Sequence, residues 1–160
     1  MTRTGLGYDS HRFAPGRPLV LGGVRVEHDK GLAAHSDGDV VLHALTDAIL
    51  GAVAAGDIGE HFPDTEAKWA NADSGAFLQH ARELAAGKGY RVGNCDITIL
   101  AEKPKLSPYK AKMAARIAEL LDVPAHRVSV KAKTNEGMGF VGRSEGIACL
   151  ATVLLEKEEE

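Results

Sequence analysis

Asp9 and His11 are two residues apart in a stretch whose pattern predicts an extended strand. Side chains two positions apart on a strand point to the same side, so this carboxylate and this imidazole can bind one metal ion. His43 lies in an apolar helical stretch, one turn from Asp39 and one turn from Asp47, and such carboxylates can fix the tautomer of a ligating histidine. Three oxygen and nitrogen ligands leave the fourth position of a zinc ion open, which is typical of a catalytic site. The alternative for each residue is a plain surface or hydrogen-bonded role.

Two loops that flank the helical stretch carry groups suited to a phosphorylated polyol. The run 35–39, His-Ser-Asp-Gly-Asp, comes just before the helix, where backbone N–H groups and polar side chains favour an anion. A capping loop explains the aspartates of this run but does not require His35. The run 57–64 holds two aspartates that can accept the hydroxyl groups of a polyol, although such residues more often only shape a turn.

Two later segments have features that suit a nucleotide. The segment 101–106 is predicted to leave a strand through a proline turn, and the resulting backbone slot can bind the edge of a base. An ordinary strand-to-helix connection is the alternative. The glycine-rich run that follows residue 132 offers Lys133 and Thr134 to phosphate oxygens and Glu136 to a hard divalent ion. It is not a Walker loop, because no Gly-Lys-Ser or Gly-Lys-Thr closes it.

Strands and helices mixed along the chain must position these residues. The pattern predicts strands over 3–13, 91–101, 128–132 and 147–155, a hairpin over 19–26 and helices over 39–55, 73–87 and 107–121. Asp73 or Ser74 is expected to cap the second helix, and Ser107 the third. Gly5 and Gly7 are expected to bring the first strand close to another element. The predicted fold is α/β (α+β), a single mixed β-sheet with helices packed on one face. The apolar last strands need a cover on both faces, which a partner subunit can provide.

The length and composition fit one globular domain and do not favour binding to nucleic acid or to a membrane. The 160 residues suit one domain, predicted over 1–155, with an acidic solvated tail over 156–160. A net charge of -3 argues against bulk attraction to nucleic acid or to an anionic membrane. Cys95 and Cys149 lie in apolar strand-like runs and are expected to be buried free thiols. Because we find neither a signal-peptide core nor a membrane-length apolar run, a cytoplasmic location is expected.

The motifs, taken in order, resemble those of the 2-C-methyl-D-erythritol 2,4-cyclodiphosphate synthases, enzymes of the non-mevalonate isoprenoid pathway. The resemblance spans 5–155, and its most specific parts are 7–13, 35–47, 57–64, 104–106 and 133–137. It implies that Asp9, His11 and His43 hold zinc and that Glu136 contacts magnesium or manganese. It also implies that His35 and Thr134 are catalytic, because they hold phosphates and stabilise the transition state.

The resemblance further implies a substrate-binding set with two parts, one for the methylerythritol unit and one for the cytidine and diphosphate. Its members are Asp9, His11, His35, Ser36, Asp57, Ile58, Gly59, Phe62, Asp64, Ala101, Pro104, Lys105, Leu106, Lys133, Thr134, Glu136, Phe140 and Arg143. Within this set, Phe140 and Arg143 are expected to face a central cavity that can take an isoprenoid diphosphate. The implied assembly is a homotrimer around the sheets, with active sites between adjacent subunits.

The implied reaction converts 4-diphosphocytidyl-2-C-methyl-D-erythritol 2-phosphate to 2-C-methyl-D-erythritol 2,4-cyclodiphosphate and CMP. It is a lyase reaction that proceeds by metal-assisted intramolecular phosphoryl transfer. Two other functions remain open from the residues alone. In a zinc phosphohydrolase, the same three ligands would activate water. In a non-catalytic trimeric carrier, the chain would bind nucleotide or isoprenoid diphosphates without turnover.

Overall fold

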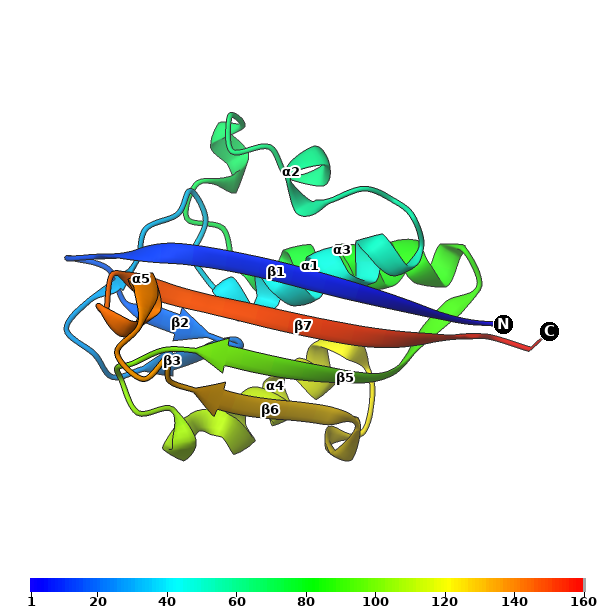
Figure 1. The fold of residues 1–160 in the computed structure, drawn as a ribbon. Coiled ribbons are helices and arrows are strands. Elements are labelled where there is room, and N and C mark those ends of the chain that lie inside the picture. The colour runs from blue at the N-terminus through cyan, green and yellow to red at the C-terminus, as the bar shows by residue number, and fades with distance from the viewer. Residues whose placement is uncertain (160) are drawn as a thin grey trace.

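One curved five-stranded sheet organises residues 1–159, which are the residues that the computed structural model describes (Figure 1). Its strand order is β4-β1-β7-β5-β6, and a separate two-stranded hairpin joins β2 to β3. The elements are β1 (Thr2–Ala14), β2 (Leu19–Leu21), β3 (Val24–Val26), β4 (Gly31–Leu32), α1 (Val40–Ala52), α2 (Ile58–His61), α3 (Ser74–Gly87), β5 (Tyr90–Leu100), α4 (Lys110–Leu121), β6 (Val128–Lys133), α5 (Gly139–Gly142) and β7 (Gly146–Lys157), with short 3-10 helices at Ala67–Trp69, Ser107–Tyr109 and Ala125–Arg127.

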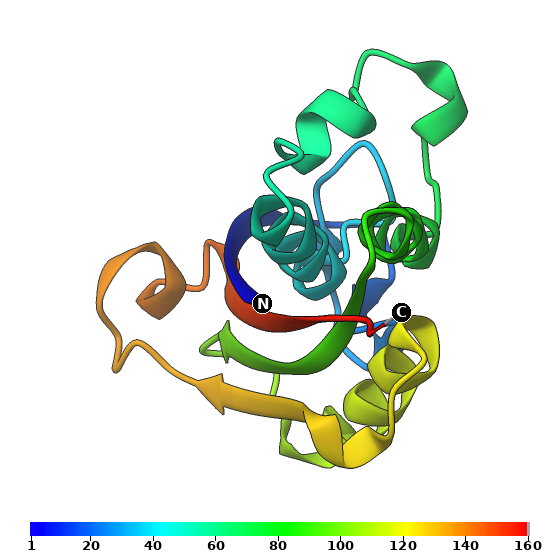
Figure 2. The same ribbon diagram turned by 90° about the vertical axis from the view of Figure 1, so that its right-hand side faces the viewer.

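The sheet is mixed, as the sequence predicts. β7 pairs antiparallel with both β1 and β5, whereas β5 and β6 run parallel. The helices α1, α3 and α4 lie on one side of the curved sheet, and the short helix α5 projects on the other side (Figure 2). α1 is buried along almost its whole length and forms the centre of the core, which explains its unbroken apolar composition.

Two glycines let α1 lie directly on β1. A Cβ atom on Gly5 would come within 1.8 Å of the Ala48 carbonyl oxygen, and one on Gly7 within 1.7 Å of the Ala44 carbonyl oxygen. Any side chain at either position would therefore push the helix away from the strand. The predicted close approach at these glycines is confirmed, and it brings α1 next to the odd-numbered residues of β1.

The side of the sheet that carries no long helix is partly apolar and exposed. Leu6, Tyr8 and Leu150 are exposed large hydrophobic residues, and Tyr8 lies opposite Leu150 in the β1–β7 ladder. Leu6 lies opposite Thr152 in the same ladder. The expected cover of this face by a partner subunit stays a prediction.

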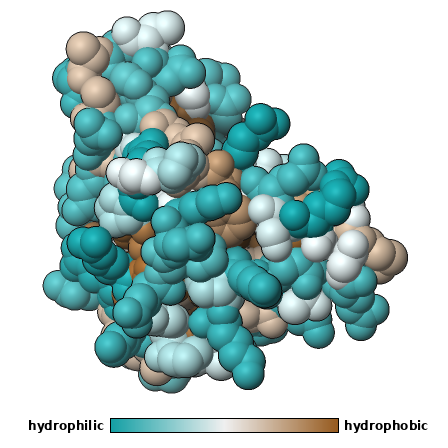
Figure 3. Space-filling model, turned by 90° about the vertical axis from the view of Figure 1, so that its left-hand side faces the viewer, coloured by the Kyte–Doolittle hydropathy of each residue, from teal (hydrophilic) through white to brown (hydrophobic). Residues whose placement is uncertain are grey.

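One end of the molecule is mostly hydrophilic, with hydrophobic surface visible in a hollow near its middle (Figure 3).

The prediction that a solvated tail begins at residue 156 was wrong. β7 continues to Lys157, so Glu156 and Lys157 are strand residues and not solvated coil. Glu156 pairs with Thr2 in the ladder, and its carboxylate forms an ion pair with Arg91 at 3.2 Å. Backbone pairing along the sheet therefore outweighs the local charge that predicted coil. Residue 160 of the predicted tail lies outside the described residues.

Other element boundaries differ less. Asp73 caps α3, as predicted, by accepting the Gly75 N–H. The prediction that Ser107 caps the third long helix was wrong, because Ser107 begins a 3-10 turn and α4 starts at Lys110. The run 57–64 and the glycine-rich run after residue 132, for which no helix was predicted, contain the short helices α2 and α5.

The two cysteines are buried and free, as expected. Burial, assisted by the negative charge of Asp96, raises the pKa of the Cys95 thiol to about 12. Within residues 1–159, none of the helices combines the length and the apolar character needed to cross a membrane.

Candidate metal centre and substrate pockets

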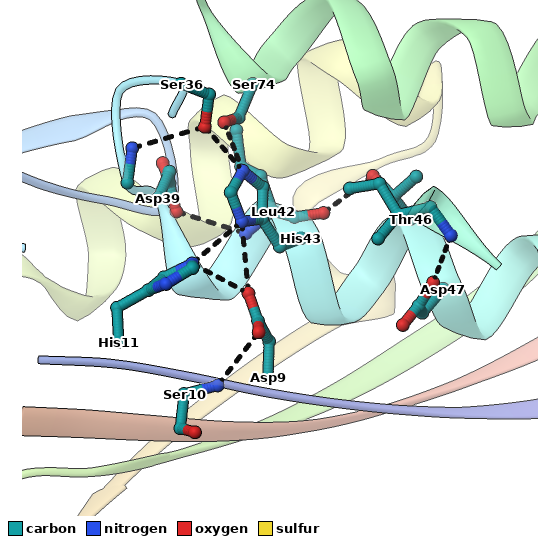
Figure 4. Close-up of polar contacts among 12 residues, drawn as sticks. Asp9, Ser10, His11, Ser36, Asp39, Leu42, His43, Thr46, Asp47 and Ser74 are labelled. Atoms are coloured by element: carbon teal, nitrogen blue, oxygen red, sulfur yellow. Dashed lines mark hydrogen bonds and ion pairs between the residues drawn. The ribbon is translucent and has the colours of Figure 1, made fainter. Parts of the chain in front are cut away.

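The three predicted metal ligands meet at one point between β1 and α1 (Figure 4). The Asp9 Oδ2 atom lies 2.9 Å from His11 Nε2 and 3.0 Å from His43 Nδ1, and the two ring nitrogens are 3.0 Å apart. Ligand atoms bound at about 2.0–2.1 Å to a tetrahedral zinc ion would lie about 3.3 Å apart. This triangle of one oxygen and two nitrogens therefore fits a divalent metal ion with only a small expansion.

The electrostatic setting of Asp9 also suits a cation. Burial by itself raises the pKa of this carboxyl, but hydrogen bonds and positive charge from His11 and His43 outweigh burial and lower it to about 2. Asp9 is therefore ionised throughout the neutral range. The site presents an anionic oxygen between two imidazole nitrogens, which is a donor set that zinc and similar ions accept.

Two hydroxyl groups, and not the predicted carboxylates, contact the far side of the His43 ring. His43 is only 7% exposed, and its Nε2 atom lies 2.8 Å from Ser74 Oγ and 3.0 Å from Ser36 Oγ. Figure 4 shows both serines on the side of the ring opposite Asp9. Ser74 is the first residue of α3, so the packing of α3 beside α1 supplies this contact.

The expectation that Asp39 and Asp47 orient His43 was wrong, because both carboxylates are used elsewhere. Asp39 is fully buried and accepts the N–H groups of Gly22, Gly23 and Leu42. Burial raises the pKa of Asp39 to about 6, even though these hydrogen bonds oppose the shift. Asp47 accepts the N–H of Ile58 at 2.7 Å, and this bond ties the start of α2 to α1.

A cavity of about 460 Å³ opens beside the triad, and we call it the metal pocket. Its predicted lining residues are Asp9, His11, His35, Ser36, His43, Ile58, Gly59, Phe62 and Asp64. Pro63, within the predicted run 57–64, also lines it, and so do Ala34, Thr65, Trp69 and Phe77, which were not predicted. Asp57 does not line the cavity, since its carboxylate caps α2 by accepting the Glu60 N–H at 3.1 Å.

Aromatic side chains form one wall of the metal pocket, and only Phe62 among them was predicted from the sequence. The ring centroid of Phe62 lies 4.3 Å from that of Phe77 and 5.0 Å from that of Trp69. The first pair is tilted and the second is edge-to-face, and contacts of this kind stabilise the packing of the rings. Phe62, Trp69 and Phe77 come from three different segments, so no local spacing could have grouped them.

The loop with His35 is held from two sides. The His35 Nε2 atom lies 2.9 Å from the Glu66 carbonyl oxygen, and the Asn71 N–H donates to the His35 carbonyl oxygen. Arg17 donates to the carbonyl oxygens of Ala34 and Ser36, the two neighbours of His35. His35 is exposed at the rim of the metal pocket, where its ring can reach a ligand.

A second cavity of about 320 Å³, which we call the loop pocket, follows β6. It is lined by Ala132, Lys133, Thr134, Asn135, Glu136 and Met138. Glu102 supports it, because one of its carboxylate oxygens accepts the N–H groups of Asn135 at 2.8 Å and Gly137 at 3.2 Å. The Ala101 N–H donates to the Lys133 carbonyl oxygen, so the segment 101–106 begins beside this pocket.

The remaining predicted residues lie in the segment 101–106, which begins beside the loop pocket, or on α5. Ala101 and Leu106 are buried, while Pro104 is partly exposed and Lys105 exposed. Phe140 and Arg143 lie on α5, where Phe140 is exposed and Arg143 pairs with Glu145 at 2.9 Å.

The two pockets share no lining residue. Within one chain, the structure therefore gathers the metal ligands with the 57–64 loop, and separately gathers Lys133, Thr134 and Glu136.

A family model described as the YgbB family matches residues 2–156. The chain belongs to the YgbB family. It is 58% identical over 153 residues to a protein of Xanthomonas axonopodis pv. citri named 2-C-methyl-D-erythritol 2,4-cyclodiphosphate synthase, covering 96% of this chain and 92% of that relative. A relative of the same name from Idiomarina loihiensis is 56% identical, with 96% and 97% covered. The predicted family and the prediction of an enzyme of this class are confirmed.

Solved structures agree with this membership. IspF from Plasmodium falciparum in a CDP complex matches with a TM-score of 0.87 and 36% identity, covering 99% of this chain and 97% of that one. The bifunctional IspDF from Campylobacter jejuni matches with a TM-score of 0.96 and 46% identity over 99% of this chain. This chain spans 43% of that longer protein, so it resembles one part of it.

Proposed function

We propose that this chain converts 4-diphosphocytidyl-2-C-methyl-D-erythritol 2-phosphate to 2-C-methyl-D-erythritol 2,4-cyclodiphosphate and CMP in non-mevalonate isoprenoid biosynthesis. The observation that carries the proposal is the convergence of Asp9, His11 and His43 in one cavity with the loop 57–64. The names of its YgbB relatives support the same reaction.

In the proposed reaction, the substrate's own 2-phosphate attacks the β-phosphorus. A new oxygen–phosphorus bond closes the ring, and the bond from that phosphorus to the CMP oxygen breaks. The attacking phosphate is already ionised near neutral pH, so the protein needs no strong base. Its task is to hold two anions together in line, and orientation of this kind can contribute up to roughly 7–11 kcal/mol.

Separate residues would meet the separate demands of this reaction. Asp9, His11 and His43 would hold a divalent ion, which we propose to be zinc, and Glu136 would hold magnesium or manganese. When bound, these ions supply positive charge that stabilises phosphate oxygens. His35 and Thr134 would donate hydrogen bonds to oxygens whose charge changes in the transition state. Asp57, Gly59 and Asp64 would lie around the methylerythritol unit.

The cytidine and diphosphate would bind at 101–106, Lys133 and Thr134. The CDP complex of the P. falciparum relative supports a cytidine nucleotide as the ligand class. Because the metal pocket and the loop pocket share no lining residue, we propose that a complete active site combines the metal pocket of one subunit with the loop pocket of a neighbour. A homotrimer would also cover the exposed apolar face around Leu6, Tyr8 and Leu150.

Phosphorus NMR of the purified protein with the proposed substrate and divalent metal tests the reaction. A cyclic diphosphate and CMP are the expected products. A linear monophosphate or diphosphate would replace the cyclase with a phosphohydrolase, in which water attacks instead of the 2-phosphate. Binding of the substrate without any product would leave a carrier as the function.

A further inference from the structure

The hydrogen bonds behind His43 form a directed chain to a carboxylate. Ser74 is fully buried, its Oγ atom lies 2.8 Å from His43 Nε2, and its hydroxyl donates to Asp37 Oδ1. The Ser74 N–H also donates to Asp37 Oδ2 at 3.1 Å, so both carboxylate oxygens face Ser74. The three residues come from separate parts of the chain, namely α1, the start of α3 and the loop before α1.

The direction of these bonds determines where the proton of His43 lies. A serine hydroxyl has one proton, and an ionised carboxylate can only accept. The Ser74 proton therefore goes to Asp37, and the Ser74 oxygen is left to accept from His43. When the ring is neutral, as metal binding requires, its proton must then be on Nε2. The lone pair of Nδ1 is thereby left for a metal ion at the point where Asp9 and His11 each lie 3.0 Å from Nδ1.

We propose that Ser74 and Asp37 are positioning residues that set the tautomer and ring orientation of His43 for metal binding. This inference rests on the proposed use of the Asp9, His11 and His43 triad as a metal site. A ligating histidine commonly donates its other ring N–H to a carboxylate or carbonyl. Here a buried hydroxyl stands between the ring and the carboxylate.

Ser36 serves as an internal comparison for this chain of bonds. Its Oγ atom lies 3.0 Å from His43 Nε2 and also 3.4 Å from the Gly38 N–H, which donates to it. Among the described residues, no carboxylate accepts the Ser36 hydroxyl proton, so this hydroxyl can turn to donate or to accept. Ser36 therefore fills space beside the ring without specifying its tautomer, and removing it should matter less than removing Ser74.

A purely structural role for Ser74 and Asp37 makes a different prediction. Asp37 also accepts the Asp39 N–H at 3.0 Å, and its bond to the Ser74 N–H supports the start of α3. If that support were the whole role, loss of any bond at this helix start would have the same effect. Asp73 provides the matched control, because its carboxylate accepts the Gly75 N–H at 2.8 Å at the same helix start.

The test is zinc affinity, measured by competition with a chromophoric chelator on the full chain. Ser74→Ala should weaken zinc binding by about 10- to 100-fold, as is typical when the outer partner of a ligand is lost. Ser36→Ala should weaken zinc binding less. Asp73→Ala should leave zinc affinity within about twofold of the wild type, while lowering the stability of the fold as the loss of a helix N-cap does. Zinc affinity in Ser74→Ala equal to that in Asp73→Ala would overturn the proposal.

Two further measurements keep the test decisive. Asp37→Asn removes the negative charge with little change of shape, so it serves if Ser74→Ala does not fold, and unchanged affinity in it would overturn the proposal. In the zinc-loaded protein, proton NMR should detect a slowly exchanging His43 Nε2–H that exchanges faster in Ser74→Ala. If the wild-type protein binds no divalent metal, both the metal site and this inference are overturned. If the wild-type protein binds zinc tightly and Ser74→Ala binds it with the same affinity, this inference alone is overturned.

Discussion

The metal pocket and the loop pocket are held in place by different kinds of contact. In the metal pocket, the ligands come from β1 and α1, which are pressed together at Gly5 and Gly7 with no side chain between them. In the loop pocket, Thr134 and Glu136 are exposed and sit on a glycine-rich loop that Glu102 holds through two backbone N–H groups. Core packing thus prepares the first pocket, whereas a few hydrogen bonds prepare the second.

This difference suggests which parts of the proposed active site a single chain can complete. Metal ligands need fixed positions, and a buried helix on a sheet provides them. A loop that binds a nucleotide can adapt, and its partner surface would come from the neighbouring subunit. Four experiments test this difference between the two pockets.

The largest expected effect concerns whether the two pockets of one chain work together. Asp9→Ala and Thr134→Ala should each be nearly inactive in the proposed trimeric ring. Every active site in a ring of Asp9→Ala subunits has a damaged metal pocket, and every active site in a ring of Thr134→Ala subunits has a damaged loop pocket. In mixed rings of a head-to-tail trimer, one interface joins the two intact halves. Random co-assembly should therefore restore about a quarter of the wild-type activity.

Activity of the co-expressed proteins, with ring composition verified by mass spectrometry, provides the measurement. The two variants mixed as separately assembled rings form the control and should stay inactive. Verified mixed rings with no recovered activity would contradict the shared site, while the metal chemistry could still hold.

The next effect concerns the helix–strand contact under the metal pocket. Gly7→Ala should lower the free energy of unfolding by more than about 3 kcal/mol, because the new Cβ collides with the Ala44 carbonyl oxygen and not with a movable side chain. Gly137→Ala, next to the lining residues of the loop pocket, adds a Cβ atom that meets nothing within 4 Å, but the φ of +77° at this position is unfavourable for alanine. This change should lower the free energy of unfolding by about 1 kcal/mol. Denaturant unfolding of both variants compares the two regions, and equal losses would refute the contrast.

A smaller effect concerns the charge of Asp9 in the metal-free protein. Its pKa is about 2 when folded, against 3.8 for an unperturbed aspartate, so the unfolded state takes up the proton first as the pH falls. The stability that Asp9 contributes is therefore fully present above about pH 4 and is lost toward pH 2. At about 1.4 kcal/mol per pKa unit, this amounts to about 2 kcal/mol.

Unfolding curves between pH 2 and pH 6, with a chelator present, should be flatter for Asp9→Asn than for the wild type. An identical pH dependence in the two proteins would mean that His11 and His43 do not stabilise the Asp9 carboxylate in the folded state.

The smallest effect concerns Glu102 and the loop pocket. Glu102→Ala removes the acceptor of the Asn135 and Gly137 N–H groups, and it should weaken CDP binding about tenfold, equivalent to about 1.4 kcal/mol. Glu102→Gln retains an oxygen acceptor and should bind nearly as the wild type does. Calorimetry with CDP and elemental analysis for zinc would measure both pockets at once, and a loss of zinc in Glu102→Ala would show that the pockets are not independent.

Local pattern in the sequence determined much of this protein. The two-residue spacing of Asp9 and His11 in the predicted strand places both on one side of β1. The apolar stripe over 39–55 predicts α1 and places His43 on it. The residues Asp73 and Ser74 mark the start of α3. Each of these features depends on neighbours a few positions away. The order of the motifs was enough to predict the family, and the mixture of strand and helix patterns was enough to predict the mixed sheet.

Which side chains meet depends on how separate elements pack together in three dimensions. Ser74 contacts His43, 31 positions away in the sequence, and Asp37, 37 positions away. These contacts form because the packing of α3 beside α1 places the first residue of α3 next to the His43 ring. Asp39, four residues before His43, instead accepts the N–H groups of Gly22 and Gly23 between β2 and β3. Sequence periodicity identifies which face of a helix is buried, but the partner of a buried polar group depends on the relative placement of separate elements, and that placement is set by the packing of the whole core.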